Sequence, residues 1–388
     1  MIEKFETQAI RTQMERSKHS EHSSPLHLTS SFVFDSAEDM RDAFTEEKKF
    51  NIYTRFTNPN TTEFIQKVAQ MEGAEDGVAF ASGMGAIFST FGAFLNSEDH
   101  IVSCNAIFGS THTLFTKYLP KWNISTSYFK VSDLEKVESL IQSNTKCIFA
   151  ESPTNPGLDI LDLEALGKLA KKHKILLIID NCLATPYLQK PISFGADLVI
   201  HSATKLMDGQ GRVLGGLTVG KKELIKELFL FARNTGASLS PFNAWVLSKS
   251  LETLSLRVDR HCDNALKIAH QLEKQTNVNR VKYPFLKSHP QYNLAKKQML
   301  KGGNIISFEV EGGLEEARDF INSIKMCSIS ANLGDSRTII THPASSTHSK
   351  LSAEDRLKVG ITDGMIRLSV GLEHHEDIWN DIKNALKT

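Results

Sequence analysis

The sequence has 388 residues, of which 40% are hydrophobic and 23% charged, so it is long enough for two or three domains with a large core. Its 45 Lys and Arg residues equal its 45 Asp and Glu residues, which excludes a strongly basic surface that would hold nucleic acid or anionic lipid by net charge. The polar, partly acidic N-terminus is unlike a signal or transit peptide, and no apolar run approaches the roughly 20 residues of a membrane span. We therefore expect a cytoplasmic protein with no membrane or nucleic-acid partner, whose partners are small molecules and other protein chains.

Five cysteines lie far apart in the sequence, with no CxxC pair, and no HExxH pattern occurs. This spacing predicts neither a metal site nor a disulfide framework. We expect reduced, buried thiols at Cys104, Cys147, Cys182, Cys262 and Cys327.

Residues 1–56 show little periodicity, apart from a strand-like stretch at 25–34, and we expect an arm that leans on a neighbouring subunit. Residues 57–245 begin with a predicted helix that ends at Gly73 and then alternate short apolar runs with helical patterns. Such alternation predicts an α/β domain with a mostly parallel, helix-covered sheet. The expected strands are residues 77–81, 100–104, 146–151, 175–180, 196–202 and 213–220.

The remainder, residues 246–388, is predicted to form a smaller α+β domain. One long helical pattern covers residues 240–274 across the expected boundary. Further strands are expected at 304–310 and 365–370, and further helices at 313–325 and 376–386.

Polar residues that follow the apolar runs are the candidates for a site, because ligands of open α/β sheets bind at the carboxyl ends of strands. Ser82, Gly83 and Met84 lie between a strand and a helix, where free N–H groups favour a phosphate, although a simple turn would look the same. Asn155 sits in a proline-rich turn that a plain change of direction would also explain. Asp180 ends a buried strand, where a carboxylate needs a cation, a metal or a helix to cap.

The stretch that ends in Lys205 adds an amine to these groups. Partial burial after a strand would lower the pKa of Lys205 and leave a nucleophilic amine, whereas a solvated lysine is the plainer alternative. Ser202 and Thr204 would join Gly83 and Met84 in an anion cradle. A cradle, an acid and an amine at one sheet edge match the phosphate, pyridine nitrogen and aldehyde of pyridoxal 5′-phosphate (PLP).

The chain also resembles a known family over essentially its whole length, the PLP enzymes of cysteine and methionine metabolism of the cystathionine γ-synthase and methionine γ-lyase type. The motifs that carry the resemblance are NIYTRFTNP, ASGMGAI, ESPTNP, DNCLATPYLQKP, ADLVIHSATK, SPFNAWVLSKSLETLSLR, LGDSRTIITHPASSTH and IRLSVGLE. The resemblance implies the fold of PLP-dependent transferases of fold type I, as in aspartate aminotransferase.

The resemblance also implies roles for single residues. Lys205 would form the Schiff base with PLP, Asp180 would face the pyridinium, and Gly83, Met84, Ser202 and Thr204 would hold the phosphate. Tyr53 and Arg55 would reach the phosphate of the neighbouring subunit, in a homotetramer built as a dimer of active-site dimers. Arg367 would bind the substrate α-carboxylate and Asn155 would lie near the 3′ oxygen of PLP. The motif histidines, His342 and His348, would shape the substrate pocket.

Three positions narrow the subfamily. Phe108 stands where many members have a tyrosine stacked on the cofactor ring, Ser110 where γ-lyases carry a cysteine, and Asn332, in the substrate site, where γ-lyases tend to have serine. The segments FGST, DGQGRVLGG, SPFNAW and ANLGDSRT are most similar to the O-succinylhomoserine sulfhydrylase branch, and Asn332 supports this assignment. Phe108 can stack but cannot donate a proton, so Lys205 would act as the proton shuttle and an acyloxy group would be a suitable leaving group.

We therefore expect γ-replacement on O-acylhomoserine, with sulfide as the acceptor and homocysteine as the product. The nearest alternatives are cystathionine γ-synthase, with cysteine as the acceptor, and a γ- or β-lyase of the same family. A nucleotide-binding module and a noncatalytic scaffold are the alternatives from other classes. The glycine spacing fits no P-loop or dinucleotide motif, and the presence of Lys205 and Asp180 disfavours a scaffold.

Overall fold

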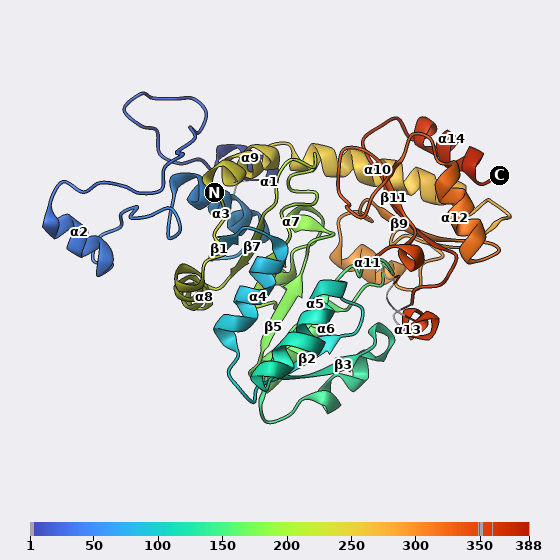
Figure 1. Cartoon of the computed structure of the whole chain (residues 1–388), viewed down its shortest axis with the longest axis horizontal. Coiled ribbons are helices and arrows are strands. Elements are labelled where there is room, and N and C mark those ends of the chain that lie inside the picture. The colour runs from blue at the N-terminus through green and yellow to red at the C-terminus, as the bar shows by residue number, and fades with distance from the viewer. Residues whose placement is uncertain (1–3, 348, 350–351, 359, 388) are drawn as a thin grey trace.

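Two β-sheets organise the chain, and a long N-terminal arm projects away from both (Figure 1). The computed structural model describes residues 4–347, 349, 352–358 and 360–387. The division into segments 1–56, 57–245 and 246–388 stays a prediction.

The larger sheet has seven strands in the order β1-β7-β6-β5-β4-β2-β3. Neighbouring strands from β6 to β3 are parallel, and β7 runs antiparallel to both β1 and β6. Every residue of β2, β6 and β7 is buried, as expected for apolar runs covered on both faces. The mostly parallel sheet is therefore confirmed. Its strands are β1 Asp76–Phe80, β2 His100–Cys104, β3 Ser125–Phe129, β4 Thr145–Glu151, β5 Leu176–Asp180, β6 Leu198–His201 and β7 Gly216–Gly220.

Helices with one apolar face pack on this sheet. The predicted helix end at Gly73 is present: Gly73 has a left-handed φ of 77°, and its N–H donates to the carbonyls of Ala69 and Gln70. At the other end of this helix the Asn58 side chain accepts a hydrogen bond from Asn60 N–H and caps the first turn. The helices of this part are α3 Pro59–Glu72, α4 Gly83–Phe94, α5 Gly109–Thr113, α6 Leu163–His173, α7 Thr185–Leu188 and α8 Lys222–Thr235.

The smaller sheet has five strands in the order β10-β11-β12-β9-β8, and it is antiparallel apart from the β10–β11 pair. Its apolar face buries residues of α10, α12 and α14 in a second core. The strands are β8 Val278–Lys282, β9 Ile305–Val310, β10 Ser328–Ile329, β11 Ile339–Thr341 and β12 Met365–Ser369. The helices are α9 Pro241–Leu251, α10 Leu254–Leu272, α11 Tyr292–Gln298, α12 Leu314–Ser323, α13 Ala353–Lys358 and α14 His375–Ala385.

The prediction of one continuous helix over residues 240–274 is wrong, because this segment forms two helices, α9 and α10. The break lies at Thr253, whose φ of −116° and ψ of 13° are not helical. Arg257 reaches back across the break and donates a hydrogen bond to the Ser250 carbonyl oxygen at 2.9 Å. The side chain thus satisfies a carbonyl that a continuous helix would have paired with a backbone N–H.

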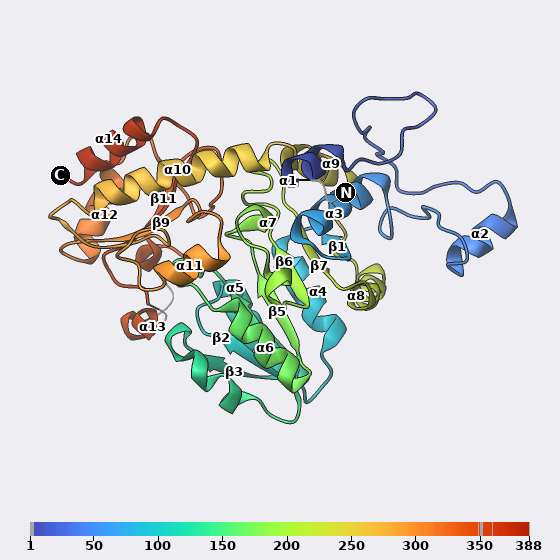
Figure 2. The same cartoon turned by 180° about the vertical axis from the view of Figure 1, so that it is seen from behind.

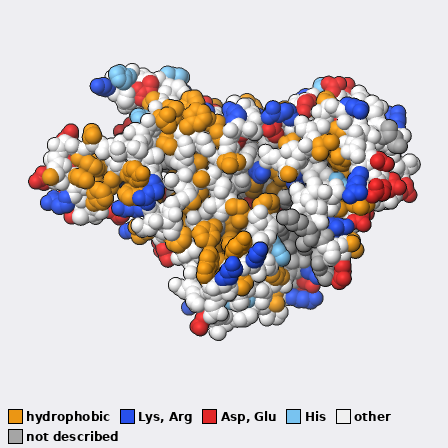
Figure 3. All heavy atoms as spheres, in the orientation of Figure 1, with side chains coloured by type: hydrophobic (Ala, Val, Ile, Leu, Met, Phe, Trp, Pro, Cys, Tyr) orange, Lys and Arg blue, Asp and Glu red, His pale blue; other side chains and the backbone are white. Residues whose placement is uncertain are grey.

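The arm contains α1 Phe5–Arg11 and α2 Ala37–Phe44, and no sheet strand occurs in the part of it that the structure describes, residues 4–56. The strand-like stretch at 25–34 forms only an isolated bridge, Ser31 to Tyr53, because it runs beside no sheet edge. Figures 1 and 2, which view the molecule from opposite sides, both show α2 and the loops around it extending away from the sheets, whereas α1 lies beside α3 and α9. In Figure 3, hydrophobic side chains gather on the arm around α2, where Met40 and Phe44 are exposed.

The described part of the chain has no helix that is both long and apolar enough to cross a membrane. All five cysteines are unpaired, and Cys182 alone among them is partly exposed. No cluster of His, Cys, Asp or Glu suited to a metal ion occurs within the described residues.

Candidate active site

The candidate site lies at the carboxyl edge of the larger sheet, where β4, β5 and β6 end together. Glu151, the last residue of β4, is in register with Asp180, the last residue of β5. Asp180 is itself in register with Ile200, two residues before Ser202. Parallel strands therefore bring the polar residues that follow each apolar run to one edge, as the sequence predicts.

The first turn of α4 meets the segment after β6 at Gly83. A Cβ added at Gly83 would lie 2.7 Å from Cβ of Ser202, so only glycine permits this approach. The Ser82 hydroxyl accepts a hydrogen bond from Gly85 N–H at 3.1 Å and caps the helix. Within the described residues, the N–H groups of Gly83 and Met84 have no acceptor. Two free N–H groups of a 12-residue helix beside the Ser202 hydroxyl suit a phosphate.

Thr204 lies in the same segment, but its hydroxyl is engaged elsewhere. It donates to the Gly215 carbonyl at 3.2 Å and accepts from Gly215 N–H at 3.1 Å. The hydroxyl that the sequence predicts for the anion cradle therefore also ties this segment to the start of β7.

Lys205 is largely buried behind the cradle. Its Nζ donates a hydrogen bond to Oδ1 of Asn332 at 2.7 Å. Burial, together with the positive charge of Arg367, lowers the pKa of Lys205 from its ordinary value. The lysine is thus both held in place and biased toward the neutral, nucleophilic amine.

Asp180 is a buried carboxylate that faces the same space. Its Oδ1 accepts a hydrogen bond from Cys182 N–H at 3.0 Å, and in the described part of the chain its other oxygen accepts none. Burial raises the pKa of Asp180 to about 6. A buried acid with a free oxygen is suited to a cationic N–H group such as a pyridinium.

Arg367, in the middle of β12, is 5% exposed and has no ion-pair partner among the described residues. Its guanidinium donates to the backbone oxygens of Ala331 at 3.1 Å and Asn332 at 3.0 Å, and to Oδ1 of Asn155 at 3.3 Å. Burial lowers its pKa to about 10. A buried cation without a carboxylate of its own is suited to an anionic ligand group.

Phe108 and Asn155 flank this space from the loops after β2 and β4. Phe108 is half-exposed, and its backbone N–H donates to Oε2 of Glu151 at 2.8 Å. Asn155 N–H donates to Oε1 of the same carboxyl at 3.0 Å. Glu151 was not among the residues predicted for the site, although its place at the end of an apolar run was the available signal. Ser110, two residues after Phe108, is exposed.

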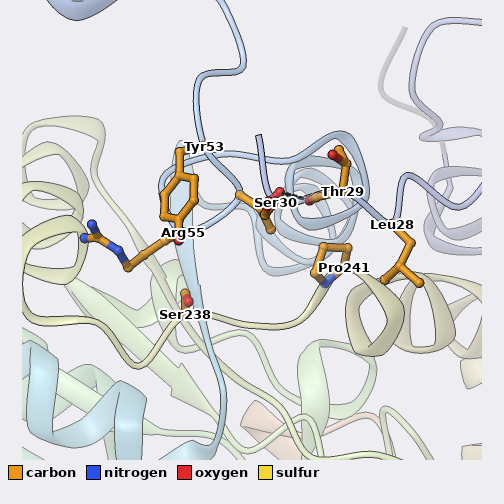
Figure 4. A pocket seen from close by; sticks show the side chains of 8 residues that line it. Leu28, Thr29, Ser30, Tyr53, Arg55, Ser238 and Pro241 are labelled. Atoms are coloured by element: carbon orange, nitrogen blue, oxygen red, sulfur yellow. Dashed lines mark hydrogen bonds between the residues drawn. The ribbon is translucent and has the colours of Figure 1, made fainter. Parts of the chain in front are cut away.

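Tyr53 and Arg55 are not brought to Lys205 of the same chain. They line a separate pocket of about 430 Å³ on the arm, together with Ser30 and Ser238 (Figure 4). Arg55 donates a hydrogen bond to the Arg233 carbonyl oxygen and lies 4.9 Å from the centre of the Phe56 ring.

Of the two histidines predicted to shape the substrate pocket, the structure describes only His342. His342 is buried, with Nδ1 2.8 Å from the Ser345 hydroxyl and Nε2 2.7 Å from the Asp363 carbonyl oxygen. Burial lowers its pKa, so it stays neutral at physiological pH and braces a loop. His348 lies outside the described residues.

Comparison with known proteins places the chain in a family. Residues 6–387 match the model of the Cys/Met metabolism PLP-dependent enzymes. The chain belongs to this family. It is 45% identical over 382 residues to the O-succinylhomoserine sulfhydrylase of Pseudomonas aeruginosa, covering 98% of this chain and 95% of that one. It is 44% identical over 366 residues to an L-methionine γ-lyase of Fusobacterium nucleatum, covering 94% and 93%.

Solved structures agree with the family. A crystal structure from Campylobacter jejuni, of a protein provisionally named an O-acetylhomoserine (thiol)-lyase, superposes with a TM-score of 0.96. It is 34% identical, covers 100% of both chains, and holds N′-pyridoxyl-lysine-5′-monophosphate at position 205. The fold is thus that of the PLP enzymes of fold type I, and the protein is a PLP-dependent enzyme of sulfur amino acid metabolism.

The described residues fit this cofactor. The close approach of Gly83 to Ser202 leaves free N–H groups for its phosphate, and Asp180 offers a free oxygen to its ring nitrogen. Lys205 offers an amine of lowered pKa to its aldehyde. PLP also brings a negatively charged phosphate beside a helix N-terminus, which is electrostatically favourable.

Proposed function

We propose that this protein catalyses γ-replacement on O-acylhomoserine, with O-succinylhomoserine as the substrate and sulfide as the acceptor. The bond between Cγ and the acyl oxygen breaks, succinate leaves with the electron pair, and sulfide forms a new C–S bond. The products are homocysteine and succinate, which assigns the enzyme to methionine biosynthesis.

The proposed cofactor residues are those that meet at the sheet edge. Gly83, Met84, Ser202 and Thr204 hold the phosphate, Asp180 faces the ring nitrogen, and Lys205 bonds to the aldehyde. The modified lysine at position 205 of the Campylobacter jejuni protein, which matches this chain over its full length, supports the assignment of Lys205. When bound, PLP supplies an aldehyde that captures amines and a ring that accepts electrons from Cα.

The proposed substrate residues are Arg367 and Asn332. Arg367 binds the α-carboxylate, which supplies the anion that this buried guanidinium lacks. Lys205, once released from the cofactor, takes the proton from Cα and then the proton from Cβ, after which the acyloxy group leaves Cγ. The Asn332 amide oxygen, 2.7 Å from Nζ, keeps this amine aimed at the substrate.

The observation that carries the acyl-ester proposal is Phe108. Its backbone N–H is hydrogen-bonded to Glu151 beside Asp180, and its ring has no ionisable group, so it cannot protonate a leaving group. A carboxylate leaves without a proton at neutral pH, because its conjugate acid has a pKa of roughly 4, whereas a thiol has a pKa of about 8.5 and is released more easily with a proton. The missing proton donor therefore favours an acylated oxygen over a thiol as the leaving group.

The second candidate is methionine γ-lyase activity, which the 44% identity to the Fusobacterium nucleatum enzyme favours. A third is cystathionine γ-synthase activity, with cysteine in place of sulfide.

One set of assays separates these activities. The purified holoenzyme is supplied with O-succinylhomoserine or O-acetylhomoserine and with sulfide or cysteine, and separately with methionine alone. Homocysteine, cystathionine and 2-oxobutyrate are then measured. We expect homocysteine from sulfide and O-succinylhomoserine as the fastest reaction, with Lys205→Ala as the inactive control. Faster release of 2-oxobutyrate from methionine, or faster formation of cystathionine from cysteine, contradicts the proposal.

We further propose that the enzyme is a cytoplasmic homotetramer in which Tyr53 and Arg55 complete the phosphate site of a neighbouring subunit. Two observations support this assembly. The arm that carries them exposes apolar side chains, with Leu28 70% and Val33 95% exposed, which a second subunit would cover. Tyr53 and Arg55 also lie apart from Lys205 of their own chain.

Mixing two inactive variants tests the shared site. Arg55→Ala and Lys205→Ala subunits are unfolded together and refolded as a mixture. If Arg55 serves the neighbouring subunit, random pairing restores one intact site in each mixed dimer and about a quarter of wild-type activity returns. If Arg55 serves its own chain, no mixed dimer has an intact site and the mixture stays inactive. Light scattering of the wild type measures the tetramer directly.

A further inference from the structure

Glu151 is a buried carboxyl for which the proposed function has no use. It is 3% exposed, it ends β4, and strand register sets it beside Asp180 on the same edge of the sheet. Two acidic side chains buried next to each other are unfavourable unless specific donors or a cation compensate them. The presence of a second buried carboxyl group at this edge therefore needs an explanation.

The carboxyl group of Glu151 accepts hydrogen bonds from two different loops. Oε2 accepts the N–H of Phe108, 43 residues earlier in the chain, at 2.8 Å. Oε1 accepts the N–H of Asn155, four residues later, at 3.0 Å. Phe108 carries the ring expected over the cofactor, and the Asn155 side chain accepts a hydrogen bond from Arg367 at 3.3 Å. One side chain thus ties together the loops on either side of the space that Lys205 and Asp180 face.

We propose that Glu151 is a positioning residue that sets the placement of Phe108 and Asn155 around the cofactor ring through these two hydrogen bonds. The inference rests on the proposed placement of PLP at Lys205, but it does not depend on which acyl ester or acceptor is used. Glu151 acts through the two backbone N–H groups and touches neither substrate nor the reacting atoms.

The two neighbouring carboxyls share one electrostatic environment. Burial, and then the neighbouring Asp180, raise the pKa of Glu151 well above its ordinary value, and burial raises the pKa of Asp180 to about 6. The pair therefore disfavours ionisation of both carboxyls at once. Whether ionised or neutral, Glu151 keeps an oxygen toward each of the two N–H groups.

A near-isosteric substitution tests the two-acceptor geometry. Glu151→Gln keeps one acceptor oxygen but puts an NH₂ group against the N–H of Phe108 or of Asn155. One of the two hydrogen bonds is therefore lost. The readouts are the affinity of the apoenzyme for PLP and the visible circular dichroism of the bound cofactor, which reports the orientation of its surroundings. We expect about tenfold weaker PLP binding and an altered dichroic band.

Asp381→Asn is the matched control. Asp381 lies on α14 at the far end of the smaller domain (Figure 1), and its carboxylate likewise accepts backbone N–H groups, from Lys325, Met326 and Cys327. The control loses the same kind of contact and should lower the unfolding temperature without changing PLP affinity or the dichroic band.

The Phe108→Ala background separates positioning from general destabilisation. In Phe108→Ala the ring that Glu151 is proposed to position is absent. Adding Glu151→Gln to this variant should therefore weaken PLP binding by only about threefold or less. An undiminished tenfold effect in that background, or wild-type affinity and dichroism for Glu151→Gln, overturns the inference. If Glu151→Gln does not fold, Glu151→Asp serves instead, because it withdraws the carboxyl by one carbon; wild-type behaviour of that variant overturns the inference equally.

The outcomes are distinguishable from those of the proposed function. Borohydride reduction and peptide mapping of the wild type show whether PLP is joined to Lys205, and product assays show which reaction occurs. A holoenzyme that proves to be a methionine γ-lyase contradicts the acyl-ester proposal and leaves the expected effects of Glu151→Gln unchanged.

Discussion

Replacing Asn332 by aspartate changes the charge beside Lys205, the proposed Schiff-base lysine, with almost no change in shape. In the wild type a neutral amide oxygen lies 2.7 Å from Nζ of Lys205, and burial lowers the pKa of that lysine. A carboxylate oxygen at the same 2.7 Å would favour the ammonium form by about 6 kcal/mol at an effective dielectric constant near 20. After a discount for burying the new carboxylate, we expect the midpoint for deprotonation of Lys205 to move up by about two pH units.

The assay is the rate at which apoenzyme captures PLP, followed by near-visible absorbance as a function of pH. Only the neutral amine attacks the aldehyde, so the rate rises with pH through the pKa of Lys205. In the wild type the midpoint of this increase in rate should lie at a pH below the ordinary pKa of lysine. In Asn332→Asp the midpoint should lie at a higher pH, with about 100-fold slower capture of PLP at pH 8. Asn332→Leu removes the hydrogen-bond acceptor without adding a charge and controls for lost packing. It should not raise the pH midpoint of the capture rate. An identical pH profile in Asn332→Asp and the wild type would refute the reasoning.

Three further changes have direct expectations. Arg367→Lys keeps the positive charge but loses the planar fork that donates to four oxygens of this chain, so KM for the acyl ester should rise by about tenfold or more with a smaller change in kcat; an unchanged KM would remove Arg367 from the substrate site. Gly83→Ala places a Cβ 2.7 Å from Cβ of Ser202, so PLP titration should show weaker binding, and unchanged affinity would count against the cradle. Glu63→Ala removes the carboxylate 3.3 Å from the buried Nζ of Lys67 and leaves that lysine with Glu252, at 3.5 Å, as its remaining ion-pair partner. Denaturant unfolding should show a loss of about 3 kcal/mol, with Glu63→Leu/Lys67→Met closer to the wild type; a loss below about 1 kcal/mol would contradict this.

The sequence predicts the edge of the larger sheet well because two local signals coincide there. Apolar runs such as residues 175–180 and 196–202 mark strands buried on both faces, and the next polar residue marks where each strand leaves the core. Parallel topology then aligns those ends without further information, which is why Asp180 and the segment that carries Lys205 meet as expected.

The elements that the sequence does not predict are those whose stability comes from distant contacts. β3, with its sequence STSYF, is only partly buried and has no clean alternation of apolar and polar residues. At the break near Thr253, Arg257 and the Thr253 N–H both donate to the Ser250 carbonyl oxygen, and the arm has no local pattern because its contacts are with other segments. One such anchor is the buried Glu63, which accepts hydrogen bonds from Met14 N–H at 3.0 Å and from the Ser248 hydroxyl at 2.6 Å.

Asn332 shows how much of the site's chemistry lies in long-range contacts. From the sequence it is one residue that differs from related lyases, whereas in the structure its side chain accepts a hydrogen bond from Lys205 and its backbone oxygen accepts one from Arg367 at 3.0 Å. Gly334, with a left-handed φ of 74°, fits so closely that a Cβ there would lie 2.7 Å from the Leu206 nitrogen. The loop that carries Asn332 is thus packed directly on the backbone of the lysine segment. A carboxylate bound to Arg367 and a proton held on Lys205 would therefore act on the same short loop, so substrate binding and the position of the base are mechanically linked.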